Sequence, residues 1–143
     1  MKKIGILFSV LVLMVLICKP VFAQEKKISD ILRGVVESNF VALENEDIDG
    51  AMRTIHTQAP GYLQTMELSK QLFPYYDLRY TLLSFNYIGK DDEYALARGK
   101  QRTTKVQGPA FQNNIVDFIY VFKQEGDVWK FWSQAVLDTQ FVQ

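Results

Sequence analysis

The residue type best suited to acid–base chemistry occurs only once in the chain, as His56. An imidazole titrates near neutral pH and can act as a general acid or base. A catalytic dyad would need a carboxylate within hydrogen-bond reach, and Asp117 is the candidate because it interrupts an apolar segment. For His56 the alternative is a partly exposed, helix-terminal imidazole that bonds backbone carbonyls. For Asp117 the alternatives are a solvated sheet edge, which we favour, or burial beside a partner with a shifted pKa.

Composition excludes several other kinds of site. One histidine and one cysteine cannot supply the four ligands of a Cys/His zinc site. The 16 Lys and Arg balance the 16 Asp and Glu, which excludes a strongly basic nucleic-acid binder. We therefore expect no metal, no cofactor and no nucleic-acid partner. Arg98, Lys100 and Arg102 resemble an anion-binding row, but a solvated sheet face, or ion pairs with acids of a neighbouring strand, is the simpler interpretation.

The first 23 residues have the pattern of an export signal. Lys2 and Lys3 precede the apolar run Ile4–Cys18, and Val21-Phe22-Ala23 fits a signal-peptidase site after Ala23. The run has 15 residues, fewer than the ~20 of a membrane-spanning helix, so a retained anchor is less favoured, as is lipidation at Cys18. Removing the three lysines of this segment leaves 13 basic and 16 acidic groups, a net charge of −3. We expect an exported protein, periplasmic or extracellular, with no stable membrane anchor after cleavage.

Hydrophobic periodicity predicts three helices in the first half of the mature chain. Apolar residues recur at helical spacing over 28–43. A short helix is expected over 48–55, capped by Asp47 or Asp49. A third helix, over 62–72, ends before Pro74 because the residue preceding proline disfavours the α conformation.

After Pro74 the sequence becomes rich in β-branched and aromatic residues and is divided by short turn signals. Four long strands are predicted, over 78–88, 94–106, 115–123 and 128–141. Successive strands with short connections favour an antiparallel meander, and long strands bend. The expected fold is one α+β domain, residues 24–143, with the helices packed in the hollow of a strongly curved antiparallel sheet, a cone-shaped α+β barrel.

Alternation assigns residues to the two faces of this sheet. Small side chains of the second strand should face the helices, since its basic residues should face water. Trp129, Phe131, Ser133, Ala135 and Leu137 share a face of the last strand and are taken to point the same way. Small residues either leave room for a pocket or let the helices pack closer. The pocket interpretation names these residues: Tyr62, Ala95, Ala97, Gly99, Trp129, Phe131, Ser133 and Ala135.

The chain resembles the nuclear transport factor 2-like superfamily. The segments that carry the resemblance are the end of the first helix, 42–47, and the closing Gly126-Asp127-Val128-Trp129-Lys130-Phe131. Residues 54–56, 72–80 and 101–106 are similar to a secreted bacterial subgroup of unassigned activity. The resemblance implies a cystatin-like cone that often holds a cavity and often dimerises through one sheet face. A fold that hosts many chemistries does not define a reaction.

The expected partner is a second copy of the chain. The residues assigned to the convex, dimer-forming face are Phe118, Tyr120, Phe122, Trp132 and Gln134. Our leading hypothesis is a non-enzymatic homodimer that binds a small apolar ligand in the cone. The alternatives are a cofactor-free isomerase, dehydratase or hydrolase that uses Asp117 or His56, and a protein-interaction module that uses the convex sheet face.

Overall fold

The computed structural model describes residues 4–142, and their side chains from Val21 onward. The first helix, α1, is Ile4–Glu44, so it begins well before the predicted start near residue 28. The reason is that Gln24–Lys27 are all good helix formers and contain no stop signal. Most of the predicted signal peptide lies outside the described side chains, and its cleavage stays a prediction. Within the residues that the structure describes, no helix is both long and apolar enough to span a membrane.

The chain divides into two compact units, with the division after Ile31 inside α1. The second unit, from Leu32, contains the end of α1, α2 (Ile48–Arg53) and α3 (Tyr62–Leu72). The bounds of α3 are those predicted, and α2 ends two residues earlier than predicted. Asp47 is the cap of α2, since its carboxylate accepts a hydrogen bond from the Gly50 N–H at 2.8 Å.

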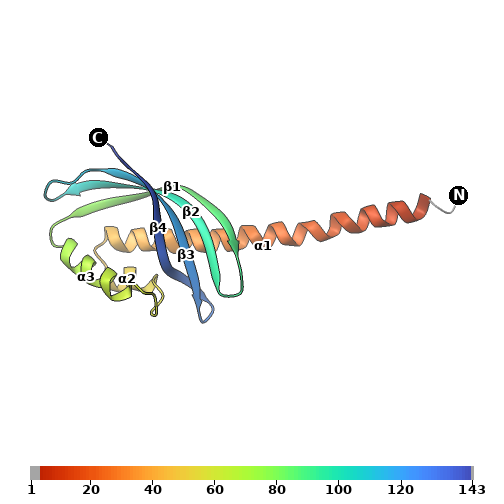
Figure 1. Cartoon of the computed structure of the whole chain (residues 1–143), viewed down its shortest axis with the longest axis horizontal. Helices are drawn as coiled ribbons and strands as arrows, with labels where there is room; N and C mark the ends of the chain where they lie inside the picture. The colour runs from red at the N-terminus through yellow and green to blue at the C-terminus, as the bar shows by residue number, and fades with distance from the viewer. Residues whose placement is uncertain (1–3, 143) are drawn as a thin grey trace. The chain divides into compact units, whose positions relative to one another are not determined.

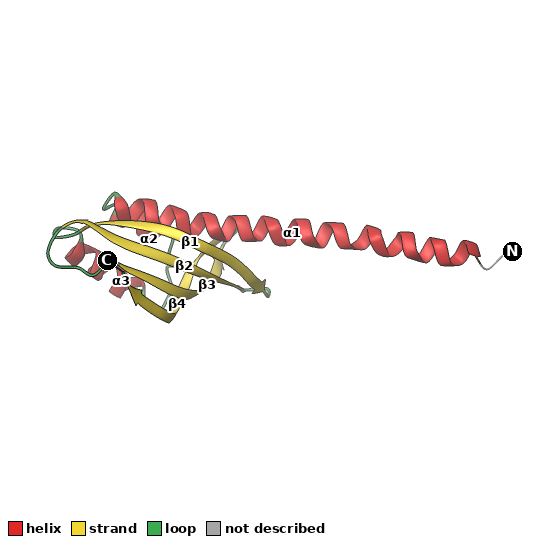
Figure 2. Ribbon diagram, turned by 90° about the horizontal axis from the view of Figure 1, so that it is seen from above, coloured by secondary structure: helices red, strands yellow, loops and turns green. Residues whose placement is uncertain are grey.

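The sheet is a four-stranded antiparallel meander in the order β1-β2-β3-β4, as predicted. Its strands are β1 (Asp77–Lys90), β2 (Tyr94–Gln107), β3 (Asn114–Glu125) and β4 (Val128–Phe141). Figure 2 shows them side by side in chain order. The strands curve, and α2 and α3 lie on the hollow side of the sheet (Figure 1). The α+β cone predicted from the sequence is therefore confirmed.

The hollow face of the sheet pairs small residues of β2 with aromatic residues of β3. Ala95 lies opposite Phe122, Ala97 opposite Tyr120 and Gly99 opposite Phe118. Ala95, Ala97 and Phe122 have no exposed surface. Large rings on one strand therefore fill the space that small side chains leave on the next, which gives the dense packing of a core. From the helix layer, the buried Leu32, Val36 and Phe40 of α1 also belong to the core.

A β-bulge in β4 changes which residues face the hollow. Phe131 pairs with Phe122, but the next partner of β3, Val121, pairs with Ser133, so Trp132 is an extra residue. One extra residue reverses the alternation beyond it. Gln134, which now lies opposite Tyr120, shares its side of the sheet, while Ser133 and Ala135 are shifted to the other side. The predicted common face of Phe131, Ser133 and Ala135 is therefore wrong beyond Phe131.

Candidate functional site

A cavity of about 440 Å³ lies in the hollow of the cone, within the second unit. Its walls come from α1, α2, the connection to α3, the first turn of α3, and strands β2 to β4. The lining residues are all apolar or uncharged polar residues: Asn39, Phe40, Leu43, Ala51, Ile55, Ala59, Pro60, Gly61, Thr65, Gln101, Phe118, Tyr120, Phe131, Trp132, Ser133 and Gln134. Among the described residues, no Asp, Glu, Lys, Arg or His lines this cavity. Such a surface suits a neutral ligand, because a buried charge would have no counter-ion there.

Tyr120 is the most unusual member of the lining. The residue is only 1 % exposed, and its ring packs against Phe118 and Phe131 at centroid distances of 5.6 and 5.7 Å. Within the described part of the chain, its hydroxyl is the buried side-chain polar atom that has no hydrogen-bond partner. Burial, with a smaller contribution from the Asp117 charge, raises the pKa of Tyr120. The hydroxyl therefore stays protonated and can donate a hydrogen bond.

Two amide side chains in the cavity wall already have partners. Asn39 donates from Nδ2 to Thr54 Oγ1 at 2.8 Å, and Gln101 donates from Nε2 to Thr103 Oγ1 at 3.2 Å. These bonds fix the wall on the α1 side and on the β2 side. Tyr120, in contrast, carries a donor that nothing in the described wall satisfies, and a buried unpaired donor costs about 1–3 kcal/mol.

The structure places only two of the eight predicted pocket residues, Phe131 and Ser133, in the cavity lining. Ser133 reaches the lining at the bulge, where the consecutive residues Trp132, Ser133 and Gln134 all contribute to the wall, and not through the alternation that was predicted. Ala95, Ala97 and Gly99 lie outside it because the rings of β3 occupy the space that they leave. A Cβ on Gly99 would lie 2.6 Å from Tyr120 Cε2, so the glycine is needed to seat this ring. Three further predicted residues also lie outside the lining: Tyr62, Trp129 and Ala135.

The predicted dimer face is wrong for its β3 residues. Tyr120 and Phe122 are 1 % and 0 % exposed and, with Phe118, lie on the hollow side of the sheet. Trp132 and Gln134 line the cavity rather than a convex surface. The β3 residues were assigned to the wrong face because their aromatic rings pack over the small residues Ala95, Ala97 and Gly99 of β2, which lie on the hollow side of the sheet. Sequence reasoning also missed Asn39, Phe40 and Thr65, although the apolar spacing of the first helix already pointed Phe40 at the core.

His56 lies at the edge of β4 and does not itself line the cavity, although its ring contacts Trp132 of the cavity wall. It is 5 % exposed, not partly exposed as predicted, and its backbone N–H donates to the Phe131 carbonyl at 2.8 Å. Its Nδ1 accepts from the Gln58 N–H at 3.1 Å, and its ring meets Trp132 edge-on at 5.2 Å. An imidazole held in this way joins the α2–α3 connection to the last strand.

The carboxylate beside His56 is Glu125, not the predicted Asp117. Glu125 Oε1 lies 3.6 Å from His56 Nδ1 and accepts from the Thr57 N–H at 2.9 Å. Lys130 and the Thr57 hydroxyl also donate to this carboxylate. Hydrogen bonds from Lys130 and then Thr57 lower the pKa of Glu125 to about 2. Glu125 is therefore a structural anion that ties the β3–β4 turn to the segment after His56.

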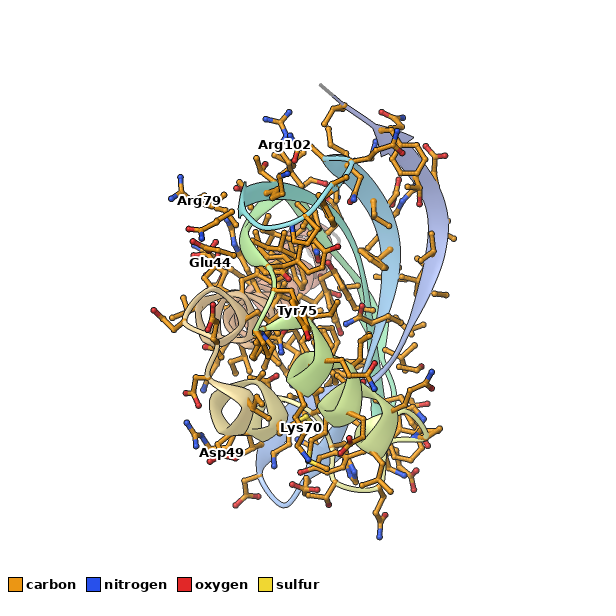
Figure 3. All side chains as sticks on the ribbon, turned by 90° about the vertical axis from the view of Figure 1, so that its left-hand side faces the viewer. Glu44, Asp49, Lys70, Tyr75, Arg79 and Arg102 are labelled. Carbon is orange, nitrogen blue, oxygen red and sulfur yellow. The ribbon has the colours of Figure 1, made fainter. Side chains whose placement is uncertain are left out.

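Asp117 is a paired structural group on the other face of the sheet. The Arg98 guanidinium donates two hydrogen bonds to its carboxylate, at 2.9 and 2.8 Å, and Lys100 Nζ lies 3.8 Å away. The carboxylate is buried, and the Arg98 hydrogen bonds hold its pKa below the ordinary value. The favoured sheet-edge placement is thus wrong, whereas the predicted pairing of the basic row with a neighbouring acid is correct. Arg79 and Arg102, in contrast, project outward (Figure 3).

Comparison with known proteins agrees with this architecture. Solved neighbours include a nuclear transport factor 2-like protein of unknown function from Shewanella oneidensis, with 13 % identity, coverage of 75 % of this chain and 96 % of that one, and a TM-score of 0.57. A ketosteroid isomerase-like protein from Erwinia carotovora atroseptica has 12 % identity, coverage of 80 % and 96 %, and a TM-score of 0.59. Bd1075 from Bdellovibrio bacteriovorus has 22 % identity and a TM-score of 0.61, but the match covers 73 % of this chain and 39 % of Bd1075.

These likenesses define the fold class: the chain has the nuclear transport factor 2-like fold, also described as cystatin-like. The family is shown by a separate comparison with models of protein families. Residues 34–142 match the model of the anti-sigma-I factor RsgI9 C-terminal domain, and the chain belongs to that family. No curated protein matches the chain.

Proposed function

We propose that this domain binds a small, uncharged and mostly apolar ligand in the cone cavity, with a hydrogen-bond-accepting oxygen at Tyr120. The observations that carry the proposal are a cavity of about 440 Å³ with Tyr120 in its lining, and the hydroxyl of that residue, which is buried without a partner. The hydroxyl has less than 1 Å² of accessible surface, so binding requires the Tyr120 ring to turn slightly towards the cavity. A ligand oxygen that accepted this hydrogen bond would remove the cost of leaving the donor unpaired. The apolar rings around it would bury the rest of the ligand.

The ligand class follows from the lining. A carboxylate or ammonium group would lose its hydration without meeting an opposite charge, so charged ligands are disfavoured. A ketone, ester or ether supplies the acceptor without a charge. The enzyme alternative receives no support from its named residues, since neither His56 nor Asp117 lines the cavity and both serve structural contacts.

The direct test is a chemical-shift titration of the mature chain with cyclohexanone, using methylcyclohexane as the matched ligand without an acceptor. We expect cyclohexanone to bind more tightly and to shift the resonances of cavity residues such as Phe40, Thr65 and Phe131. Equal affinities for the two compounds, or shifts confined to residues outside the cavity, would contradict the proposal.

We also propose that the chain forms a homodimer through β4, an edge strand. Residues 133–141 are all exposed, and Val136, Leu137 and Phe141 are 60, 51 and 67 % exposed. An unprotected apolar edge favours pairing with an identical strand, which generates a two-fold symmetric dimer. Sedimentation equilibrium should give twice the monomer mass, and Val136→Lys should shift the protein to monomer. A monomer at high micromolar concentration would refute this proposal.

The compartment is proposed on the N-terminal sequence alone. Lys2, Lys3 and the apolar run before Ala23 support export followed by cleavage after Ala23. Intact-mass measurement of the protein recovered from the periplasm or medium should correspond to a chain that begins at Gln24. A retained N-terminus in the recovered protein would contradict cleavage.

A further inference from the structure

A second hollow adjoins the cone cavity on its α3 side. It has a volume of about 190 Å³, and its apolar walls come from α1, α3 and β1. Its lining includes Leu43, Thr65, Leu68, Leu72 and Tyr80. The hollow is distinct from the cavity at Tyr120, because β3 and β4 contribute nothing to its described lining.

The two hollows meet at Leu43 and Thr65. Both residues line the cone cavity and the second hollow, and both are half-buried. The aromatic walls are also continuous, since Phe40 of the cavity stacks on Tyr80 of the second hollow at a centroid distance of 5.7 Å. A ligand that extends past Leu43 and Thr65 would therefore stay on an apolar surface.

The second hollow also accounts for exposed apolar side chains on α3. Leu68 and Leu72 are 52 and 36 % exposed, although both line this hollow. The buried Ser69 beside them is satisfied within the helix, because its hydroxyl donates to the Thr65 carbonyl at 2.9 Å. The surface thus offers apolar contact with little hydrogen-bonding demand, as an alkyl chain requires.

We infer that the two hollows form one elongated site for a neutral amphiphile, with a carbonyl oxygen at Tyr120 and an alkyl chain that runs past Leu43 and Thr65 along α3. This inference rests on the proposed function and adds the ligand class, a lipid-like molecule, and the position of its tail. Each methylene that leaves water for the second hollow should raise affinity about fourfold.

The test is a titration of the full mature chain with a series of linear 2-alkanones from 2-pentanone to 2-tridecanone. For the native chain we expect affinity to rise along the whole series. Leu68→Glu places a charge in the wall of the second hollow at an exposed position, and should remove the gain for the longer ketones while leaving 2-pentanone unchanged. Leu63→Glu is the matched control, since Leu63 is 68 % exposed on the same helix and lines neither hollow.

A second variant guards against an effect of Leu68→Glu on folding. Thr65→Phe should narrow the passage between the hollows and produce the same loss for long ketones alone. The tail site is wrong if the longer ketones still bind more tightly than 2-pentanone in both variants. It is also wrong if the affinity of the native chain stops rising at 2-pentanone. In either case the site at Tyr120 stands. If no ketone binds, both proposals fail.

Discussion

A Cβ atom on Gly99 of β2 would lie 2.6 Å from Cε2 of Tyr120 on β3, so the absence of a side chain at residue 99 gives the tyrosine ring its place. The Ser84 carbonyl oxygen of β1 lies 3.1 Å from the same point. A backbone atom cannot move aside as a flexible side chain can. The space in which the Tyr120 ring packs is therefore provided by a glycine on the neighbouring strand.

Gly99→Ala should lower the free energy of unfolding by about 1–3 kcal/mol, because overpacking forces the ring or the strand to shift. It should also weaken cyclohexanone binding, since Tyr120 must move. The matched control is Gly89→Ala on β1, where a Cβ would meet nothing within 4 Å. Equal stability of the two variants in urea unfolding would show that the ring is not seated by Gly99.

Asp117→Asn should lower the free energy of unfolding by about 1–3 kcal/mol at neutral pH, because the carboxylate charge is lost and the amide nitrogen cannot accept the second hydrogen bond from Arg98. The pKa of Asp117 lies below its ordinary value of 3.8, so its contribution is present above that pH and is lost as the pH falls further. The variant should lack this acid-dependent loss. Asp92→Asn, at an exposed position, is the control. An identical acid profile of native chain and variant would contradict the role of the pair.

Glu125→Gln should make unfolding less dependent on acid. The pKa of Glu125 is about 2 in the folded chain against an ordinary value of 4.5, so its stabilisation is complete above about pH 4.5 and fades towards pH 2. The variant should be less stable at neutral pH and should show a flatter stability profile over that interval. Glu67→Gln, in an exposed pair with Lys70, should change the free energy of unfolding by less than about 0.5 kcal/mol. An unchanged slope between pH 4.5 and 2 in Glu125→Gln would contradict this assignment.

His56→Ala should lower the free energy of unfolding by roughly 1–3 kcal/mol, because a buried ring and its contacts with Gln58 and Trp132 are lost. Cyclohexanone affinity should stay close to that of the native chain, since His56 does not line the cavity. Thermal unfolding and the cyclohexanone titration should be measured on the same preparation of the variant, so that stability and affinity can be compared directly. A variant that keeps its stability but loses ligand binding would instead place His56 in the site.

The fold was predictable because its signals are local. Helical spacing, Pro74 and the turn at Gly126, whose φ is +62°, set the elements within a few residues of the observed bounds. The start of α1 was not predictable in this way, since the helix formers Gln24–Lys27 carry no boundary signal.

The site was harder to predict because it depends on register. One extra residue, Trp132, reverses the faces of β4, and a bulge has no clear signature in a single sequence. The small residues of β2 were correctly placed on the hollow side. Whether they leave a cavity depends on the side chains opposite them on β3, because an aromatic ring there fills the space. Ala97 opposite Tyr120 is the deciding example.

The most direct test of the account is the cyclohexanone affinity of Tyr120→Phe, which removes only the buried hydroxyl. We expect affinity to fall about 2- to 10-fold, the range for one lost neutral hydrogen bond, while methylcyclohexane binding is unchanged. Tyr75→Phe is the control, because Tyr75 is 66 % exposed and outside both hollows. If the native chain and Tyr120→Phe bind cyclohexanone equally, the Tyr120 hydroxyl does not recognise the ligand and the central claim is wrong.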